Sequence, residues 1–186
     1  MEFQEKAFQS KNGNQYLLRS PREEDAGIML AYLKKTAQET ERGLSYPEEM
    51  DMSIEEEADF IKHFLEDERS MMISVYDDDK LVGGASLSSV GEKQKIRHRA
   101  SIGIALLKDV WGQGIGRSLM TELLSFAKEA GYVQIELEVV ADNVSAIGLY
   151  ESLGFVTYGR RPNFFRLKDG NYVEGILMVL ACNKLP

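Results

Sequence analysis

The pattern of apolar and polar positions near the start of the chain predicts a short strand followed by a helix. Residues 16–19 (YLLR) have the composition of a strand. The next segment carries the start signals of a helix, because Ser20 is a good N-cap, Pro21 suits the first helical position and acids fill the first turn. We therefore expect a helix over 20–36 that begins at Ser20.

A second helix is predicted after a loop that contains Gly43 and Pro47. Residues 53–68 (SIEEEADFIKHFLEDE) open with Ser53 and Glu56 at the spacing of a capping box. Apolar residues then recur at helical spacing and predict one buried stripe, made up of Ile54, Ala58, Ile61, Phe64 and Leu65.

The remaining pattern alternates strands with two further helices. Two apolar runs around the turn DDDK predict a hairpin over 71–90, and further strands are predicted at 99–107, 132–140, 155–160 and 172–181. The longer helix ends at Gly131 and has apolar positions at Ile115, Leu119, Leu123, Phe126, Ala127 and Ala130. The shorter helix spans about 144–153 and stops at Gly154. The chain is therefore mixed α/β, with a glycine-rich turn before its longest helix.

Size and composition are those of one globular domain. The 186 residues are 44% hydrophobic and 28% charged, and we expect a single domain over 1–186 with a structured core at about 14–182. No apolar run reaches the ~20 residues that span a bilayer, and residues 1–15 lack the apolar centre of a signal peptide. Cys182 is the only cysteine in the sequence, so an intrachain disulfide is excluded. These features predict a soluble, cytoplasmic protein.

The acidic residues are concentrated in one segment. The formal net charge is −8, and residues 39–68 alone contain twelve acids against Arg42 and Lys62. Phosphate backbones usually require a basic surface, so the charge argues against nucleic acid as a partner. The acidic segment is either a solvated face or, beside a site, a surface that attracts cations.

Residues 111–120 (WGQGIGRSLM) place three glycines before the longest predicted helix. Unpaired N–H groups and a partial positive charge at a helix N-terminus suit such a turn to phosphate oxygens, although a tight strand-to-helix connection would use it equally well. A P-loop is excluded because Arg117 and Ser118 follow the last glycine in place of Lys and Ser or Thr. A dinucleotide fingerprint is disfavoured because Leu119 stands where its later glycine would be.

Two segments carry a family resemblance. Residues 104–120 (IALLKDVWGQGIGRSLM) resemble the acetyl-CoA-binding signature of the GNAT N-acetyltransferase superfamily, with Gly114 and Gly116 at its glycine positions. Trp111 stands where Arg or Gln is usual, a departure familiar in the branch that resembles ribosomal-protein N-terminal acetyltransferases. Residues 143–159 (NVSAIGLYESLGFVTYG) resemble the second cofactor motif and match it at Asn143, Ala146, Leu149, Tyr150, Gly154 and Phe155. The resemblance implies a single-domain α/β fold whose mixed, mostly antiparallel twisted sheet of about seven strands is flanked by helices.

The resemblance also implies how the chain would bind acetyl-CoA. The backbone at Leu106, Leu107 and Lys108 would pair with the pantetheine arm like an added strand. The pyrophosphate would lie on the amides of Trp111, Gly112, Gln113, Gly114, Ile115, Gly116, Arg117 and Ser118. Arg117 would add charge or be an ordinary solvated helix residue, and Asn143 would contact the arm or cap the helix behind it.

The implied reaction moves an acetyl group from the sulfur of coenzyme A to an amine. Tyr150, two helical turns after Asn143, is the candidate acid for the departing thiolate, because a phenol with a pKa of about 10 is protonated at neutral pH. An amine acceptor arrives mostly protonated and must lose a proton. Glu39, Glu41 and His98 are the candidate bases, and the sequence leaves the choice among them open.

We therefore predict an acetyl-CoA-dependent N-acetyltransferase with direct, sequential transfer. The acceptor is a small cationic amine, which the acidic segment favours, or a peptide or protein N-terminus, which the branch resemblance favours. The expected partners are acetyl-CoA and this amine, without nucleic acid, membrane or metal, and a homodimer is left open. Two alternatives are a non-catalytic acetyl-CoA-binding regulatory module and a structural domain without cofactor.

Overall fold

The computed structural model describes residues 1–182, and an eight-stranded sheet in the order β1-β2-β3-β4-β5-β6-β8-β7 forms its centre. The strands are β1 (Lys6–Gln9), β2 (Gln15–Arg19), β3 (Met71–Asp77), β4 (Lys80–Ser89), β5 (Arg99–Leu106), β6 (Gln134–Val140), β7 (Val156–Arg166) and β8 (Tyr172–Ala181). The helices are α1 (Ala26–Glu39), α2 (Ile54–Glu66), α3 (Ile115–Glu129) and α4 (Val144–Ser152), with short 3₁₀ turns at Glu23–Asp25, Pro47–Glu49 and Lys108–Val110.

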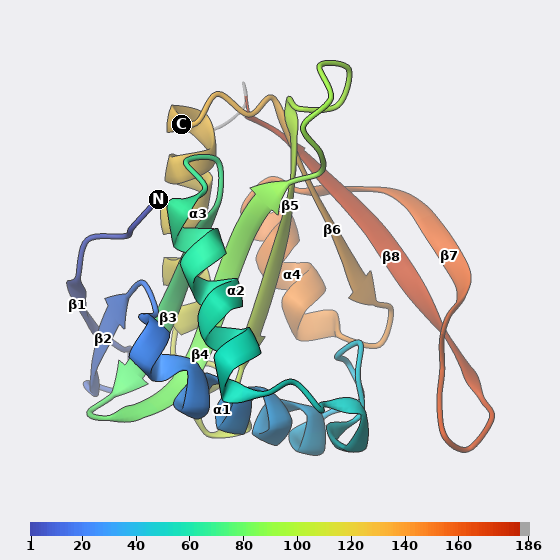
Figure 1. Cartoon of the computed structure of the whole chain (residues 1–186). Coiled ribbons are helices and arrows are strands. Elements are labelled where there is room, and N and C mark those ends of the chain that lie inside the picture. Colours follow the sequence, from blue (N-terminus) through green and yellow to red (C-terminus); the bar gives the residue numbers. More distant parts are fainter. Residues whose placement is uncertain (183–186) are drawn as a thin grey trace.

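The sheet is antiparallel except at one place. β5 and β6 are parallel, and α3 connects them as the crossover that parallel strands require. Figure 1 shows α1 and α2 in front of the sheet, α3 behind it, and the β7–β8 hairpin reaching away from the other elements. This architecture confirms the predicted α/β fold with a mixed, mostly antiparallel sheet.

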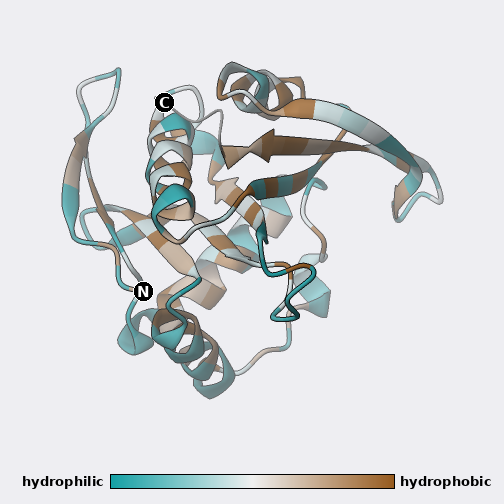
Figure 2. Ribbon diagram, turned by 90° about the horizontal axis from the view of Figure 1, so that it is seen from above, coloured by the Kyte–Doolittle hydropathy of each residue, from teal (hydrophilic) through white to brown (hydrophobic). Residues whose placement is uncertain are grey.

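The core lies between the sheet and the helices on its two faces. Figure 2 shows hydrophobic ribbon on the central strands, helices that alternate between hydrophobic and hydrophilic segments, and mostly hydrophilic loops. The largest side chains that are fully buried include Leu18, Ile73, Leu87, Leu119, Leu123, Ile135 and Met178. Among residues 1–182, no helix is both long and apolar enough to cross a membrane.

The first strand lies ahead of the predicted start of the structured core at residue 14. β1 pairs with β2 in the register Lys6↔Leu18 to Gln9↔Gln15 and adds an eighth strand to the sheet. Its four residues, KAFQ, are too few to display an alternating pattern, and their burial is intermediate only at Phe8. The strand therefore depends on pairing with β2, which a local sequence pattern does not reveal.

The first helix begins later than the sequence predicted. Ser20 is buried and does not cap it, because its hydroxyl donates to the Met72 carbonyl at 3.0 Å and accepts from the Phe3 N–H at 2.8 Å. A 3₁₀ turn follows, and α1 starts at Ala26. The apparent cap serine thus joins the N-terminal segment to β3, which is a contact that helix-start rules do not consider.

The predicted burial of the apolar stripe on α2 is confirmed at the centre of the helix and is wrong at its start. Ser53 accepts from the Glu56 N–H and Glu56 from the Ser53 N–H, so the predicted capping box is confirmed. Ile61 is fully buried, but Ile54 is 58% exposed. A Cβ placed at Gly27 on α1 would lie 3.8 Å from Ile54, so the neighbour of Ile54 has no side chain with which to cover it.

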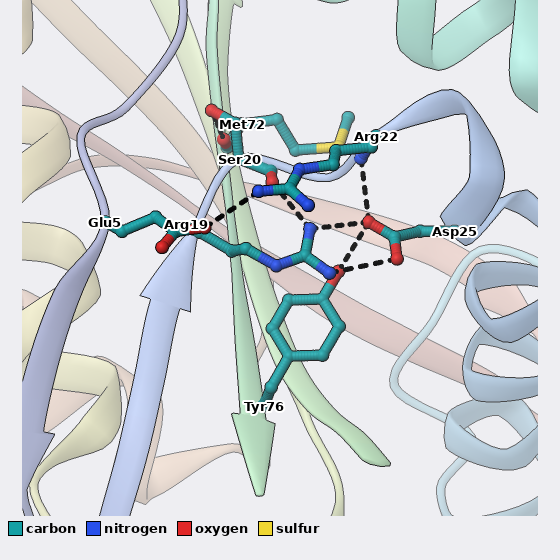
Figure 3. A network of polar contacts seen from close by, with 7 residues as sticks. All are labelled: Glu5, Arg19, Ser20, Arg22, Asp25, Met72 and Tyr76. Atoms are coloured by element: carbon teal, nitrogen blue, oxygen red, sulfur yellow. Dashed lines mark hydrogen bonds and ion pairs between the residues drawn. The ribbon is translucent and has the colours of Figure 1, made fainter. Parts of the chain in front are cut away.

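A buried ion pair holds the segment between β2 and α1 in place (Figure 3). Both guanidinium ends of Arg19 donate to the Asp25 carboxylate, at 2.6 and 2.9 Å, and the Arg22 N–H donates to it at 2.7 Å. Tyr76 on β3 donates its hydroxyl to the same carboxylate at 3.0 Å. Burial opposes ionisation of Asp25, but these four hydrogen bonds outweigh it and hold the pKa of Asp25 below its ordinary value.

We expect Asp25→Asn to lower the free energy of unfolding by about 3 kcal/mol at neutral pH, because Arg19 is left nearly buried without its anionic partner. Since the pKa is lowered in the folded state, the carboxylate stabilises the fold above the ordinary Asp pKa of about 3.9 and this contribution is lost as pH falls through the lower folded value. Urea unfolding at pH 7 and below pH 3 measures both effects. The exposed Glu23→Gln is the control, and an equal loss at both pH values would contradict the assignment.

Candidate functional site

Strands β5 and β6 separate toward the C-terminal end of β5. They pair over only three residues, Arg99–Ser101 with Gln134–Glu136, whereas β4 and β5 pair at seven positions. β6 remains paired with β8 as far as Val140. The second half of β5 therefore has one edge without a neighbouring strand, and Figure 1 shows α4 beside this gap.

The backbone groups that face the gap belong to Ile104 and Leu106. The Leu107 N–H donates to β4 at 2.9 Å, and successive strand residues direct their peptide groups to opposite edges. Ile104 and Leu106 therefore direct theirs toward β6. The Lys108 N–H is bonded to the Glu39 carboxylate at 2.7 Å. Of the three residues expected to meet a pantetheine arm, only Leu106 has its backbone at the gap, which corrects the expectation for Leu107 and Lys108.

Six consecutive N–H groups lie free at the start of α3. Within residues 1–182, the amides of 112–117 have no hydrogen-bond acceptor. The predicted cradle was wider by two residues, but the Trp111 N–H donates to the Lys108 carbonyl and the Ser118 N–H to the Gly114 carbonyl, both at 3.1 Å. We call residues 112–117 the amide turn. It combines free donors with the positive end of a helix, which is the arrangement that binds phosphate.

The three glycines of the amide turn have different functions. Gly112 and Gly114 have φ angles of 75° and 91°, in the left-handed region that side chains other than glycine rarely adopt. Gly116 is helical, and a Cβ placed there would lie 3.3 Å from Leu149 and 3.6 Å from Leu106. Two glycines therefore shape the turn, and the third allows α3 to approach α4 and β5 closely.

The loop after α1 closes one side of the gap through Arg42. Its guanidinium donates to Asn143 Oδ1 at 3.2 Å, pairs with Asp142 at 3.3 Å and lies 5.9 Å from the centre of the Trp111 ring. The Trp111 indole N–H donates to the Leu106 carbonyl at 2.8 Å. Trp111 thus acts through its side chain, whereas the sequence suggested its backbone. The sequence pattern did not indicate Arg42 as a site residue, because its partners Asn143 and Trp111 lie far from it along the chain.

Asn143 and Tyr150 occupy the start and the second turn of α4. Asn143 Oδ1 accepts from the Ala146 N–H at 3.4 Å, so Asn143 caps the helix. The Tyr150 ring is 7% exposed and packs on Phe155 with 5.9 Å between centroids. Burial raises the pKa of Tyr150 to about 12. No group of residues 1–182 hydrogen-bonds its hydroxyl, so Tyr150 is a protonated donor without a protein partner. The helix that carries it lies beside the amide turn, because Leu149 approaches Gly116.

The three candidate bases are not brought together. The Glu39 carboxylate is engaged by the Lys108 N–H and lies 3.8 Å from the Lys35 ammonium. His98 is exposed and precedes β5, at the end of the strand opposite Leu106 and roughly 26 Å from it at the rise of an extended chain. His98 is therefore corrected to a residue outside the gap, because the direction of β5 places its two ends far apart.

Glu41 is exposed and lines a cavity of about 220 Å³ between the α1–α2 loop and the β7–β8 hairpin. Its carboxylate has no ion pair or hydrogen bond within the described residues 1–182. The other walls include Tyr46, Glu49 and the rings of Phe164 and Phe165, which stack at 4.3 Å. Arg166 also lines the cavity, so its walls combine acidic and aromatic groups, which attract cations, with one basic side chain.

Two further side chains at the amide turn differ from expectation. The Arg117 guanidinium donates to the Ser152 hydroxyl at 2.6 Å and so joins α3 to α4. The Gln113 side chain is buried, where it accepts from the Tyr16 hydroxyl at 3.0 Å and donates to the Asp109 carbonyl at 3.1 Å. The bond from Tyr16 fixes the amide turn to β2, a connection for which the sequence offered no signal.

Known proteins are similar to this chain in both sequence and fold. The [Ribosomal protein bS18]-alanine N-acetyltransferase of Escherichia coli K12 is 40% identical over 77 residues, covering 41% of this chain and 51% of that protein. The first relatives matched are thus covered over about a quarter to half of their lengths. A GNAT-family acetyltransferase from Streptococcus pneumoniae superposes with a TM-score of 0.85 at 22% identity, covering 89% of this chain and 99% of that one.

A second similar structure contains a bound ligand. The yncA protein of Salmonella typhimurium, solved with acetyl-CoA, has a TM-score of 0.78 at 16% identity and covers 91% of this chain and 95% of that one. At identities this low, the structural similarity shows that the fold is shared and nothing more. The family model described as "Acetyltransferase (GNAT) family" matches residues 32–155, which include the gap and the amide turn through to α4 and Phe155. The chain therefore belongs to the GNAT acetyltransferase family.

Proposed function

We propose that this chain is an acetyl-CoA-dependent N-acetyltransferase that transfers the acetyl group directly to a primary amine. The observation that carries the proposal is the amide turn, whose six free N–H groups lie next to the unpaired edge of β5. A phosphate-bearing cofactor with a long arm fits both features, because the turn offers donors to phosphate and the strand edge offers backbone groups to an amide-containing arm. Family membership and the acetyl-CoA bound to the yncA protein support the same donor.

In this proposal the donor is held by backbone groups. The pyrophosphate accepts hydrogen bonds from residues 112–117, and the pantetheine arm lies along the edge at Ile104 and Leu106. The Leu106 carbonyl is bonded to the Trp111 indole, which leaves the Leu106 N–H for the arm. Arg42 closes the gap from the α1–α2 loop through its bond to Asn143. The thioester would thereby be directed toward α4.

The amine nitrogen attacks the thioester carbonyl carbon, the carbon–sulfur bond breaks, and negative charge develops on sulfur. Tyr150 has a pKa of about 12, whereas a thiol has a pKa of about 8.5. Complete transfer of the phenolic proton to the thiolate is therefore unfavourable, and Tyr150 acts as a hydrogen-bond donor to the developing charge. The proton that the amine loses is available to form the thiol.

The acceptor approaches through the cavity that Glu41 lines. Glu41 is the proposed base because Glu39 is bonded to the Lys108 N–H and His98 lies at the far end of β5. The carboxylates of Glu41 and Glu49 outnumber Arg166, the cation among the lining residues, and so favour an amine that arrives as a cation. A small cationic amine and a peptide N-terminus both meet this requirement, and the E. coli relative is named for the alanine of a ribosomal protein.

The test is acetylation of a panel of polyamines, other small amines and N-terminal peptides, with release of coenzyme A as the readout. We expect acetyl-CoA at 100 times its Kd to stabilise the fold by about 2.7 kcal/mol, and at least one acceptor to be acetylated. Stabilisation without acetylation of any acceptor would favour the non-catalytic acetyl-CoA-binding module. Absence of stabilisation would contradict donor binding altogether and favour a structural domain.

A further inference from the structure

The N-terminal hairpin, defined as β1, β2 and the turn between them, is fastened to the amide turn and to α3. The Lys11 N–H donates to the Gln113 carbonyl at 3.1 Å, and the Tyr16 hydroxyl donates to the Gln113 side chain at 3.0 Å. Lys6 forms an ion pair with Glu122 on α3 at 2.5 Å. The hairpin is thus held at three points, and its turn lies directly beside residues 112–117.

The side chain of Lys11 crosses the open side of Gly114. A Cβ placed at Gly114 would lie 3.7 Å from Lys11 Cγ and 3.6 Å from Lys11 Cε, so the lysine stem passes the side of the glycine at the distance where a side chain would touch it. The ammonium is one bond beyond Cε. Lys11 is exposed, and its ammonium has no ion pair or hydrogen bond within residues 1–182. An unpaired cation therefore borders the six free amides.

The Lys11 ammonium supplies a full positive charge, which the backbone amides do not. Backbone N–H groups donate hydrogen bonds to phosphate but bring only partial charge, and a diphosphate carries two full negative charges. The chain has a formal net charge of −8, which opposes the approach of a polyanion. Arg117 is the cation within the turn itself, and its guanidinium is bonded to Ser152. Lys11 is the cation that lies across the turn.

We infer that Lys11 binds the diphosphate of the acetyl donor, and that the N-terminal hairpin is therefore part of the donor site. The inference rests on the proposed function, because it assumes that the amide turn holds the phosphates of acetyl-CoA. It assigns a binding role to a hairpin that precedes the matched family region, residues 32–155. The hairpin positions Lys11 through the bond between its N–H and Gln113.

The experiment measures Kd for acetyl-CoA by calorimetry without an acceptor, in the full chain and in Lys11→Ala, Lys11→Glu and Lys95→Ala. We expect Kd to rise about tenfold in Lys11→Ala, the loss of one charge-assisted contact, and further in Lys11→Glu. Lys95→Ala is the matched control, since it removes the same charge from an exposed position in the β4–β5 loop, at the end of β5 opposite the amide turn, and its Kd should stay within about twofold of wild type. KM for acetyl-CoA should rise in parallel while kcat is unchanged.

Donor analogues separate binding of phosphate from a structural effect of the hairpin. With S-acetylpantetheine, which lacks phosphates, wild type and Lys11→Ala should have equal KM values. With acetyl-dephospho-CoA, which keeps the diphosphate and lacks the 3′-phosphate, the tenfold difference should persist. High salt should narrow the difference for acetyl-CoA, because it screens exposed charges.

Three results would overturn the inference. An unchanged Kd in Lys11→Ala, or an equal loss with S-acetylpantetheine, would remove Lys11 from phosphate binding. A difference that vanishes with acetyl-dephospho-CoA would assign Lys11 to the 3′-phosphate and contradict the diphosphate contact. If wild type itself fails to bind acetyl-CoA, the proposed function fails and the inference falls with it. That outcome is distinguishable because no variant is needed to observe it.

Discussion

Replacing Tyr150 by Phe is expected to lower kcat about 100-fold while the Kd for acetyl-CoA stays within about twofold. An aromatic ring packs against Phe155 in both proteins, so the substitution removes only the hydroxyl. That hydroxyl has no partner within residues 1–182, and burial raises the pKa of Tyr150 to about 12, so it remains a donor at every pH used for assay. Loss of a donor to charge that develops in the transition state affects kcat rather than ground-state binding.

The measurement is steady-state kinetics with the best acceptor of the panel, together with calorimetry for acetyl-CoA. Tyr158→Phe, a hydroxyl deletion on the exposed surface of β7, is the matched control and should leave kcat unchanged. Since the pKa of Tyr150 is raised, its deprotonation should cause no alkaline loss of activity in wild type below about pH 10. Equal kcat in Tyr150→Phe and wild type would exclude Tyr150 from the reaction.

Sequence reasoning was most informative where local chemistry is dictated by the backbone. Gly112 and Gly114 appear in the sequence because their φ angles are positive, and the free amides follow from the helix that begins just after them. Asn143 is recognisable because helix capping is a local interaction. The apolar periodicity of α3 identified most of its buried residues for the same reason, since one helix face packs on the sheet. It also included Ala130, which is half-buried, and left out the buried Met120 and Leu124.

The features that escaped prediction depend on contacts between distant segments. Arg42 bonds to Asn143, the Glu39 carboxylate is bonded to the Lys108 N–H, and Ser20 bridges Phe3 and Met72 rather than capping a helix. Each partner lies in another element, so no local spacing reveals it. His98 shows the converse, because a titratable side chain near a motif in sequence lies at the wrong end of the strand in space.

Gly114→Val is expected to weaken acetyl-CoA binding about 100-fold or more. Gly114 has a φ of 91°, a conformation that a β-branched residue adopts only with strain of about 2 kcal/mol. The backbone would relieve this strain by rotating toward negative φ, which turns the neighbouring amides away from the site. Losing two hydrogen bonds to phosphate, each worth about 1.5 kcal/mol, corresponds to roughly 100-fold in Kd.

The effect of backbone strain on stability must be distinguished from the effect on acetyl-CoA binding, and another glycine of the chain provides a matched control. Gly170, in the turn between β7 and β8, has a φ of 88° and no atom within 4 Å of a Cβ placed there. Gly170→Val should therefore destabilise the fold by about the same 2 kcal/mol and leave the Kd for acetyl-CoA unchanged. Urea unfolding and calorimetry on both variants measure the two effects. If Gly114→Val loses stability but binds acetyl-CoA like wild type, the phosphates are not held by the amide turn, and the donor site must be sought elsewhere.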